Sequence, residues 1–266
     1  WRDGTTDAKS VTWTIGRAII MGIPAQSGSL TYNGSAQSPV WSGHDAAKLT
    51  IGGTTSGTNA GSYNATFTPG ANYQWSDGTT TAKTVAWSIG RASVGVPSQS
   101  GTLTYNGSAQ SPVWSGHDAA KLTIGGTTSG TNAGSYNATF TPVSNYQWSD
   151  GSTAAKTVAW SIGKAAGSSS LNKSSLALST GTMSGTISVT RAGNGAVSAS
   201  SSNTNVATVS VSGTTVTVTA KAKGTATITV KVAEGTNHTA PANRTCSVSV
   251  TLPTTSLNDN TWATIK

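Results

Sequence analysis

The chain has 266 residues, enough for one large domain or about two to three small ones. Only 9% of the residues are charged, and nine Trp and six Tyr stand among 31 Gly and many Val, Ile and Thr. This composition argues against a disordered chain and a helical protein, and it favours short strands joined by glycine-rich turns. No apolar run reaches the roughly 18 residues that a membrane-spanning helix needs, and no signal peptide is recognisable. We therefore expect no membrane span in this segment.

The formal net charge is +8, but the basic residues are scattered singly along the sequence. No run of Lys and Arg resembles a nucleic-acid-binding patch, so we expect no nucleic-acid partner. Attraction to an anionic cell wall remains an alternative to a plain role in solubility. Cys246 is the single cysteine, which excludes an internal disulfide, and its alternating surroundings predict a small core residue.

An internal repeat decides the domain organisation. Residues 30–69 recur without change as residues 103–142, an offset of 73 positions. The wider match of residues 24–92 with residues 97–165 covers 69 positions and differs at seven. Residues 1–18 match the end of a repeat, so we expect the chain to be part of a longer protein.

Within the first repeat, alternating apolar residues and turn signals such as Asn33-Gly34 predict short strands. Val85, Trp87 and Ile89 alternate onto one face of the last of these strands. The strands expected in chain order are residues 30–32, 39–41, 48–51, 62–67, 73–75 and 83–89. Six strands in 73 residues predict a small β-sandwich.

The repeat contains few large aliphatic side chains, so its aromatic residues must supply most of the core. The aromatic residues of the first repeat are Tyr32, Trp41, Tyr63, Phe67, Tyr73, Trp75 and Trp87. The alternative is a sugar-stacking platform made of Trp41, Tyr73 and Trp75, with Trp114, Tyr146 and Trp148 in the second repeat. Trp41 and Trp114 follow Ser-Pro and precede a loop, which makes these two the candidate ligand contacts.

The region after residue 165 has a different pattern. Strands are expected at residues 186–189, 206–211, 215–218 and 224–230, with turns such as Ser212-Gly213 between them. The stretch NTNVATVSVSGTTVTVTAKAKGTATITVKV resembles the group 2 bacterial immunoglobulin-like domain. The repeats, with YNGSAQSP and GTNAGSY, resemble the bacterial Ig-like repeats of large surface and phage virion proteins. These resemblances imply an all-β chain of tandem immunoglobulin-like β-sandwich modules in a linear array.

Five segments are expected on this basis. They are the C-terminal end of a preceding Ig-like repeat (1–18), two Ig-like repeats (19–92 and 93–165), a group 2 bacterial Ig-like domain (166–252), and a linker with the start of a further domain (253–266).

The joins and the C-terminal end carry further expectations. The joins at residues 17–22 and 91–96 are short and apolar, which predicts limited bending, whereas the Gly- and Ser-rich join at 164–170 predicts a looser hinge. Residues 256–266 resemble the opening of a domain that follows such arrays in phage tail and virion proteins of Gram-positive hosts. Asn258 or Asp259 would cap a helix that carries Trp262 and Ile265 on one face.

Few groups are available for chemistry. Each repeat places a His beside an Asp, at His44-Asp45 and His117-Asp118, but a solvated loop explains this pair better than a catalytic or metal site. No metal-ligand motif, phosphate loop or nucleophile elbow is present, so we expect no catalytic residue, no cofactor and no metal. Lys48 and Lys83, with Asp45 or Asp77 assisting, leave open a Lys–Asn cross-link of the kind found in Gram-positive surface fibres.

The resemblance implies a non-enzymatic structural or adhesion segment of a phage virion, in a tail, a fibre or a capsid decoration. Repeated modules would serve spacing and multivalent attachment. The expected partners are other virion or surface-protein subunits and host-cell or mucus glycans, and the expected location is the virion. The alternatives are the stalk of a bacterial cell-surface adhesin and a carbohydrate-binding accessory module of a larger enzyme.

Overall fold

The computed structural model describes residues 2, 4, 6 and 8–252. These residues form strands and no helix, which confirms the all-β fold class. The described part of the chain thus contains no helix that is long and apolar enough to cross a membrane. The predicted helix after Asn258 lies outside the described residues.

The chain divides into two compact units, and the boundary runs through the second repeat. The first unit consists of residues 1–97, 116–124 and 139–156, and the second consists of residues 98–115, 125–138 and 157–266.

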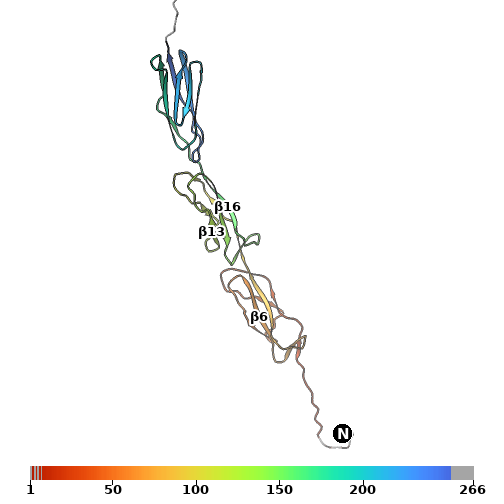
Figure 1. The fold of residues 1–266 in the computed structure, drawn as a ribbon. Helices are drawn as coiled ribbons and strands as arrows, with labels where there is room; N and C mark the ends of the chain where they lie inside the picture. Colours follow the sequence, from red (N-terminus) through yellow and green to blue (C-terminus); the bar gives the residue numbers. More distant parts are fainter. Residues whose placement is uncertain (1, 3, 5, 7, 253–266) are drawn as a thin grey trace, which may run out of the picture. The chain divides into compact units, whose positions relative to one another are not determined.

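The first repeat, in which Figure 1 labels β6, is built around a four-stranded sheet with the order β3-β8-β6-β5. Strands β5, β6 and β8 pair antiparallel, whereas β3 lies parallel to β8. Two smaller pairs complete the repeat, an antiparallel pair of β2 with β4 and a parallel pair of β1 with β7. The strands are β1 (Ala18–Ile20), β2 (Ala25–Ser27), β3 (Leu30–Thr31), β4 (Val40–Ser42), β5 (Leu49–Gly53), β6 (Gly61–Pro69), β7 (Tyr73–Trp75) and β8 (Lys83–Gly90). All six predicted strands are confirmed, and β1 and β2 are additional.

Aromatic rings fill the core of this repeat, as the sequence predicted. Phe67, Trp75 and Trp87 are at most 2% exposed, and Trp41 and Tyr63 pack against them from the rim. The remaining core residues are Ile20, Leu49, Ala65 and Ile89. Each buried indole also donates a hydrogen bond to a loop carbonyl, from Trp75 Nε1 to Thr81 O at 2.9 Å and from Trp87 Nε1 to Thr54 O at 2.7 Å. The core rings therefore hold the loops as well as the sheet.

The second repeat has the same strand plan. Its sheet has the order β11-β16-β14-β13, beside the pairs β10–β12 and β9–β15. Phe140, Trp148 and Trp160 are buried, as are their counterparts in the first repeat. The strands are β9 (Ala92–Val94), β10 (Ser98–Ser100), β11 (Leu103–Thr104), β12 (Val113–Ser115), β13 (Leu122–Gly126), β14 (Gly134–Pro142), β15 (Tyr146–Trp148) and β16 (Lys156–Gly163).

The C-terminal module is a sandwich of two four-stranded sheets, ordered β17-β19-β22-β21 and β18-β24-β23-β20. Its core is aliphatic, with Ile187, Val216, Val218 and Ile228 fully buried, and Cys246 lies among them as predicted. Burial raises the pKa of the Cys246 thiol. The strands are β17 (Ser169–Leu171), β18 (Ser175–Ser179), β19 (Ser184–Arg191), β20 (Val197–Ser201), β21 (Ala207–Ser212), β22 (Thr215–Ala220), β23 (Gly224–Val232) and β24 (Arg244–Thr251).

The Gly- and Ser-rich join before this module is more closely held than its composition predicted. The Gly167 amide donates to Thr239 Oγ1 at 3.2 Å, and a Cβ at Gly167 would lie only 1.9 Å from the Thr239 carbonyl oxygen. Glycine is therefore required there by the close approach of another backbone segment. The looser hinge remains a prediction, but these residues are fastened to the module that they precede.

Candidate functional site

The structure places its most specific polar contacts where one module meets residues of the next. In the first repeat the meeting point is the loop between β5 and β6, which contains Asn59 and Ala60. Tyr63 fixes this loop, because its hydroxyl donates to the Asn59 carbonyl at 2.6 Å. The Tyr63 ring in turn stacks on the core residue Trp87, with ring centroids 4.5 Å apart. The loop is therefore anchored to the aromatic core through two rings.

Gly57 makes this anchoring possible. Its backbone forms a bridge with Gln37, and a Cβ at this position would meet the Tyr63 ring at 2.5 Å. Any larger residue would push the ring off the loop.

Asn145, which precedes β15 in the second repeat, binds this loop with both ends of its side chain. The Ala60 amide donates to Asn145 Oδ1 at 2.9 Å, and Asn145 Nδ2 donates to Asn59 Oδ1 at 3.0 Å. Beside these bonds the rings of Tyr32 and Tyr146 meet edge to face at 5.5 Å. We call this pair of hydrogen bonds, with its aromatic contact, the clasp.

The same clasp occurs where the second repeat meets the C-terminal module. The Ala133 amide donates to Asn237 Oδ1 at 2.8 Å, and Asn237 Nδ2 donates to Asn132 Oδ1 at 3.0 Å. Tyr105 meets His238 edge to face at 5.4 Å. The C-terminal module differs in sequence from the repeats, and yet its clasp also uses an Asn followed by a residue with an aromatic ring.

The joins use a common arrangement to present the clasp Asn. Each module begins with a basic residue followed by an alanine. The alanine forms a parallel β-pair with the residue that follows the clasp Asn: Ala18 with Tyr73, Ala92 with Tyr146, and Ala165 with His238. The alanine amides donate to the carbonyls of Asn72, Asn145 and Asn237 at 2.9, 3.0 and 2.9 Å. The first two joins thus form the short strands β1 and β9, the third forms a single bridge, and each join fixes the position of its Asn.

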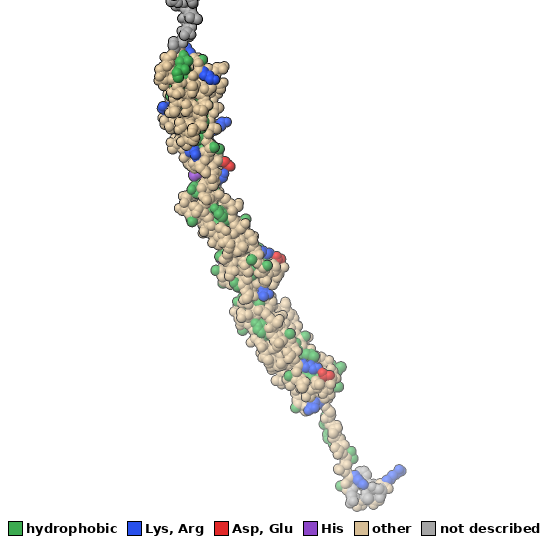
Figure 2. Space-filling view, in the orientation of Figure 1, with side chains coloured by type: hydrophobic (Ala, Val, Ile, Leu, Met, Phe, Trp, Pro, Cys, Tyr) green, Lys and Arg blue, Asp and Glu red, His purple; other side chains and the backbone are tan. Residues whose placement is uncertain are grey.

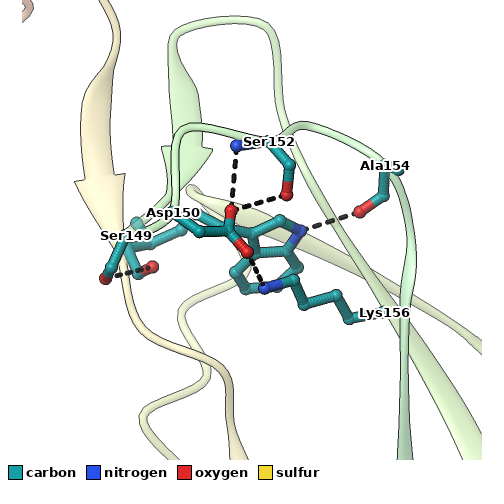
Figure 3. Close-up of polar contacts among 7 residues, drawn as sticks. Ser149, Asp150, Ser152, Ala154 and Lys156 are labelled. Atoms are coloured by element: carbon teal, nitrogen blue, oxygen red, sulfur yellow. Dashed lines mark hydrogen bonds and ion pairs between the residues drawn. The ribbon is translucent and has the colours of Figure 1, made fainter.

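A second polar cluster closes the turn between β15 and β16 (Figure 3). Asp150 accepts hydrogen bonds from the amide and hydroxyl of Ser152 at 2.9 and 2.6 Å, and it pairs with Lys156 Nζ at 2.6 Å. Lys156 Nζ lies 5.4 Å from the ring centroid of Trp148, whose Nε1 donates to Ala154 O at 2.7 Å. The cluster covers one core tryptophan and fixes the turn around it.

These contacts explain the acidity of the turn carboxylates. The hydrogen bond from Lys156, followed by those from Ser152, holds the pKa of Asp150 well below its usual range. In the first repeat Lys83 and Thr79 act on Asp77 in the same way. Asp77 and Asp150 form ion pairs at the surface, and both carboxylates are ionised near neutral pH.

The adjacent His and Asp of each repeat serve different structural partners, as the loop interpretation expected. His44 Nε2 lies 3.2 Å from the Leu49 carbonyl, and its ring lies against Phe67 at 5.4 Å. Asp45 accepts from the Ala47 amide at 3.0 Å and pairs with Lys48 at 2.8 Å. Among the described residues no three His, Cys, Asp or Glu side chains gather in a way that could hold a metal ion.

The lysines considered for a Lys–Asn cross-link lie at the surface. The side chains of Lys48 and Asp45 are 48% and 47% exposed, and those of Lys83 and Asp77 are 27% and 49% exposed. Neither carboxylate is buried, and each forms an ion pair with its lysine.

The candidate ligand contacts Trp41 and Trp114 are half-buried in the β4 and β12 strands. Trp41 meets Phe67 edge to face at 5.0 Å, and its backbone neighbour across the pair is Gln26. Trp75 is 1% exposed, which removes it from the proposed sugar platform. A role of Trp41 and Trp114 in ligand contact therefore remains a prediction that involves their exposed edges alone.

A hollow of about 490 Å³ lies beside β1 in the first repeat. Ile19, Met21, Asp45, Lys48 and Tyr73 are among the residues that line it. Trp41 is not among these lining residues, so the hollow and the candidate tryptophans are separate features.

A comparison with models of protein families matches one part of the chain. Residues 172–242 match the model of the bacterial Ig-like domain (group 2). The C-terminal module belongs to this family. The resemblance seen in its sequence is therefore confirmed, and Asn237, within the match, supplies the clasp of this domain.

No curated protein matches the chain in sequence. Among solved structures, domains 4 and 5 of the S-layer protein SbsC are 20% identical, with 58% of this chain and 98% of that chain covered and a TM-score of 0.31. The fibronectin(III)-like modules of Clostridium thermocellum CbhA are 14% identical, with coverages of 58% and 91% and a TM-score of 0.26. Immunoglobulin domains 1–4 of Sidekick-1 are 11% identical, with coverages of 90% and 75% and a TM-score of 0.32.

In the group 2 Ig-like domain, His238 stands where the repeats have the clasp tyrosine, and it packs against Gly193. Its Nδ1 is buried without a hydrogen-bond partner, and a Cβ at Gly193 would lie 2.7 Å from that atom. Gly193 also has a φ of +79°, so both backbone conformation and space require glycine there.

Sequence reasoning missed the clasp. The signal was present as a shared dipeptide, Asn72-Tyr73, Asn145-Tyr146 and Asn237-His238, each following a basic residue and an alanine earlier in the chain. In the first repeat, the partner loop contains Asn59 and Gly61, residue types that indicate a turn. Only the folded structure brings this loop and the Asn-Tyr dipeptide together.

Proposed function

We propose that this chain is a non-enzymatic structural and adhesion segment of a phage virion, in a tail, a fibre or a capsid decoration. Its modules would space neighbouring domains and present repeated surfaces for multivalent attachment. Partners would be other virion or surface-protein subunits, together with host-cell or mucus glycans.

The observation that carries this proposal is the repetition of one connection between modules. The clasps at Asn145 and Asn237 use the same two hydrogen bonds and an aromatic contact, although the modules beyond them differ in sequence. A chain that keeps the connection while the modules vary suits a spacer better than a catalyst. Near-identical neighbouring repeats raise the effective concentration of any weak surface contact.

The surface of the described chain is consistent with this role. Figure 2 shows charged side chains scattered singly or in pairs of opposite sign, with wide stretches between them that carry no charged side chain. The Asp45–Lys48 and Asp150–Lys156 ion pairs are at least partly exposed, and His44 lies within hydrogen-bond distance of a backbone carbonyl. A non-enzymatic segment requires no reactive side chain, so these structural contacts are compatible with the proposed role.

An antibody raised against the repeat tests the location. Negative-stain images of the source particles and of the host cells would be compared after labelling. Label on phage tails, fibres or capsids supports the proposal. Label on the bacterial envelope with bare virions overturns it and favours the stalk of a cell-surface adhesin, an alternative that the bacterial Ig-like family of the C-terminal module supports.

The carbohydrate-binding alternative depends on Trp41 and Trp114, since these rings keep a partly exposed edge. A glycan array probed with the parent chain and with a Trp41→Phe, Trp114→Phe variant would test it. Phenylalanine keeps a ring against Phe67 but shortens the exposed edge. Binding by the parent that the variant loses would support glycan contact at these residues, and equal binding by both would remove them from the site.

A further inference from the structure

Each repeat carries an Asn-Gly pair in an exposed turn. The pairs are Asn33-Gly34 and Asn106-Gly107, and the two glycines have φ angles of +83° and +84°. An asparagine followed by glycine can react with its own backbone, because glycine has no side chain that shields its amide nitrogen. These two turns are therefore candidate sites of a covalent change.

The contacts of the first of these turns leave the reaction open. Asn33 Oδ1 accepts a hydrogen bond from the Ser35 amide at 2.9 Å, so a donor already points at the oxygen on which negative charge develops when the side-chain carbon is attacked. Within the described part of the chain, Asn33 Nδ2 and the Gly34 amide make no hydrogen bond. Neither the leaving nitrogen nor the attacking nitrogen is thus held by another group. Asn106 accepts from the Ser108 amide at the same distance of 2.9 Å.

The third Asn-Gly pair of the sequence, Asn194-Gly195, lies in the C-terminal module and is held at both residues. Asn194 Nδ2 donates to Thr236 Oγ1 at 3.1 Å, and Asn194 Oδ1 accepts from the Thr236 amide at 2.9 Å. Gly195 is buried, and a Cβ there would lie 1.8 Å from the Ala233 carbonyl oxygen. The same dipeptide is therefore protected in the C-terminal module and unprotected in the two repeats.

We propose that Asn33 and Asn106 are sites of intramolecular deamidation, and that formation of isoaspartate at each of them loosens the neighbouring clasp. In the first repeat the Gly34 nitrogen gives its proton to a base derived from water and attacks Asn33 Cγ. The bond between that nitrogen and Cγ forms, the Cγ–Nδ2 bond breaks, and Nδ2 takes a proton from water and leaves as ammonia.

Water then opens the resulting succinimide ring at either of its carbonyls. Attack at Cγ gives aspartate, whereas attack at the main-chain carbonyl gives isoaspartate, in which the main chain runs through Cγ. One water is consumed and one ammonia is released in both cases, and nothing is oxidised or reduced. The neutral amide of Asn33 has become a carboxylate.

The position of the turn connects this chemistry to the clasp. Tyr32, whose ring meets Tyr146, lies directly before the turn, and Gln37, which forms a backbone bridge with Gly57, follows it. Gly57 lies against Tyr63, the residue that holds the clasp loop. Isoaspartate adds an atom to the main chain between the ring and the loop of the clasp. The turn must absorb that atom, so the two parts of the clasp should lose their fixed relation.

The first experiment follows the reaction in the full 266-residue chain. The purified protein is kept in mildly alkaline buffer, which favours removal of the amide proton, and is sampled over time. Trypsin then separates the three Asn-Gly pairs onto peptides of different sequence. Mass spectrometry measures the mass gain that marks the replacement of the amide by a carboxylate, and fragmentation distinguishes isoaspartate from aspartate. The peptides cover residues 18–48, 92–121 and 192–221.

The two turns should react much faster than the protected pair. We expect Asn33 and Asn106 to convert at least about tenfold faster than Asn194, because two hydrogen bonds must break before Asn194 can react. A synthetic peptide of residues 28–38 serves as the unstructured reference. Equal rates at the three sites, or no conversion at Asn33 and Asn106 while the peptide converts, would overturn the proposal.

A second experiment tests the effect on the clasp. Hydrogen exchange follows the Ala60 amide, which donates to Asn145 Oδ1, before and after conversion of Asn33. Its exchange should quicken by about threefold or more in molecules that carry isoaspartate. Asn33→Ser is the matched control, because serine keeps an oxygen that can accept from the Ser35 amide and has no amide group to lose. In this variant the Ala60 amide should stay unchanged over the same incubation.

The second clasp and a charge variant complete the test. In the Asn33→Ser chain the Ala133 amide should still quicken as Asn106 converts, since each turn acts on its own clasp. Asn33→Asp introduces the charge without lengthening the main chain, and it should leave the Ala60 amide close to that of the fresh parent. Exchange at Ala60 that rises equally in Asn33→Ser, or that stays constant in the converted parent, overturns the effect on the clasp. An equal rise in Asn33→Asp would assign the effect to charge and overturn the role of isoaspartate.

Discussion

The two repeats and the group 2 Ig-like domain bury their cores with different side chains. In the first repeat, three aromatic residues and four aliphatic residues form the buried core. In the C-terminal domain, fifteen buried residues, none of them aromatic, lie between two complete four-stranded sheets. A repeat with few large aliphatic residues must concentrate its buried area in a few rings, whereas the C-terminal domain spreads that area over many small contacts.

An aromatic core also fixes the conformation of loops at the surface. Each buried indole donates a hydrogen bond to a loop carbonyl, and Tyr63 connects Trp87 to the clasp loop. An aliphatic core has no such polar atoms. A change in one ring of a repeat should therefore affect distant loops, whereas a change in one aliphatic residue should remain local.

The largest effects are expected from truncating one core residue in each region. Trp75→Ala should destabilise the first repeat by about 3–5 kcal/mol, and Ile228→Ala should destabilise the C-terminal domain by about 2–5 kcal/mol. No Trp lies between residues 161 and 261 and the single Cys lies at 246, so tryptophan fluorescence reports on the repeats and thiol labelling on the C-terminal domain. Each variant should shift one probe alone. A shift of both probes by either variant would show that the two regions unfold together.

A smaller effect sharpens the role of the indole nitrogen. Trp87→Phe keeps an apolar ring stacked against Tyr63 but removes the donor to the Thr54 carbonyl. The loss should be about 1–3 kcal/mol, and hydrogen exchange should quicken in residues 54–60 more than in the strands. The Val218→Ala variant of the C-terminal domain is the comparison, since no loop bond depends on it. Uniform loosening of the whole repeat would argue against a specific link from core to loop.

The two clasps test whether the connection depends on the ring beside the Asn. Asn145→Ala removes two hydrogen bonds next to Tyr146, and Asn237→Ala removes two next to His238. Each should cost at most about 1 kcal/mol per bond, because the contacts are partly exposed. Exchange of the Ala60 amide should rise in the first variant and that of the Ala133 amide in the second. A rise in both amides in either variant would contradict independent clasps.

The smallest effect concerns acid. The pKa values of Asp77 and Asp150 are depressed by Lys83 and Lys156, so these carboxylates stabilise the folded repeats above their unfolded pKa of about 4. That contribution is lost as the pH falls below about 4 through the folded pKa. Asp77→Asn with Asp150→Asn should therefore lower the melting temperature slightly at pH 7 and make it less sensitive between pH 6 and pH 3. Thermal scans followed by tryptophan fluorescence check this, and they are extended to about pH 2 because most of the loss falls below the unfolded pKa. An unchanged acid sensitivity would assign the effect to other carboxylates.

Much of the fold could be predicted from the sequence. Alternation predicted the strands from β3 to β8, and the shortage of large aliphatic residues predicted that Phe67, Trp75 and Trp87 would be buried. The pattern of residues 203–232 predicted the group 2 Ig-like domain. These features follow from local periodicity and from how much apolar area a module must bury, and both can be read along a single chain.

The contacts of the clasp could be seen only in the folded structure. Asn145 is 85 residues from Ala60, and Asn237 is 104 residues from Ala133, so no local pattern connects them. The sequence did not reveal β1 and β9, because three-residue strands are too short to show alternation and their pairing partners lie more than fifty residues away. Hydrogen bonds of this kind depend on where the folded backbone places each loop, and that position is fixed by packing of the whole module.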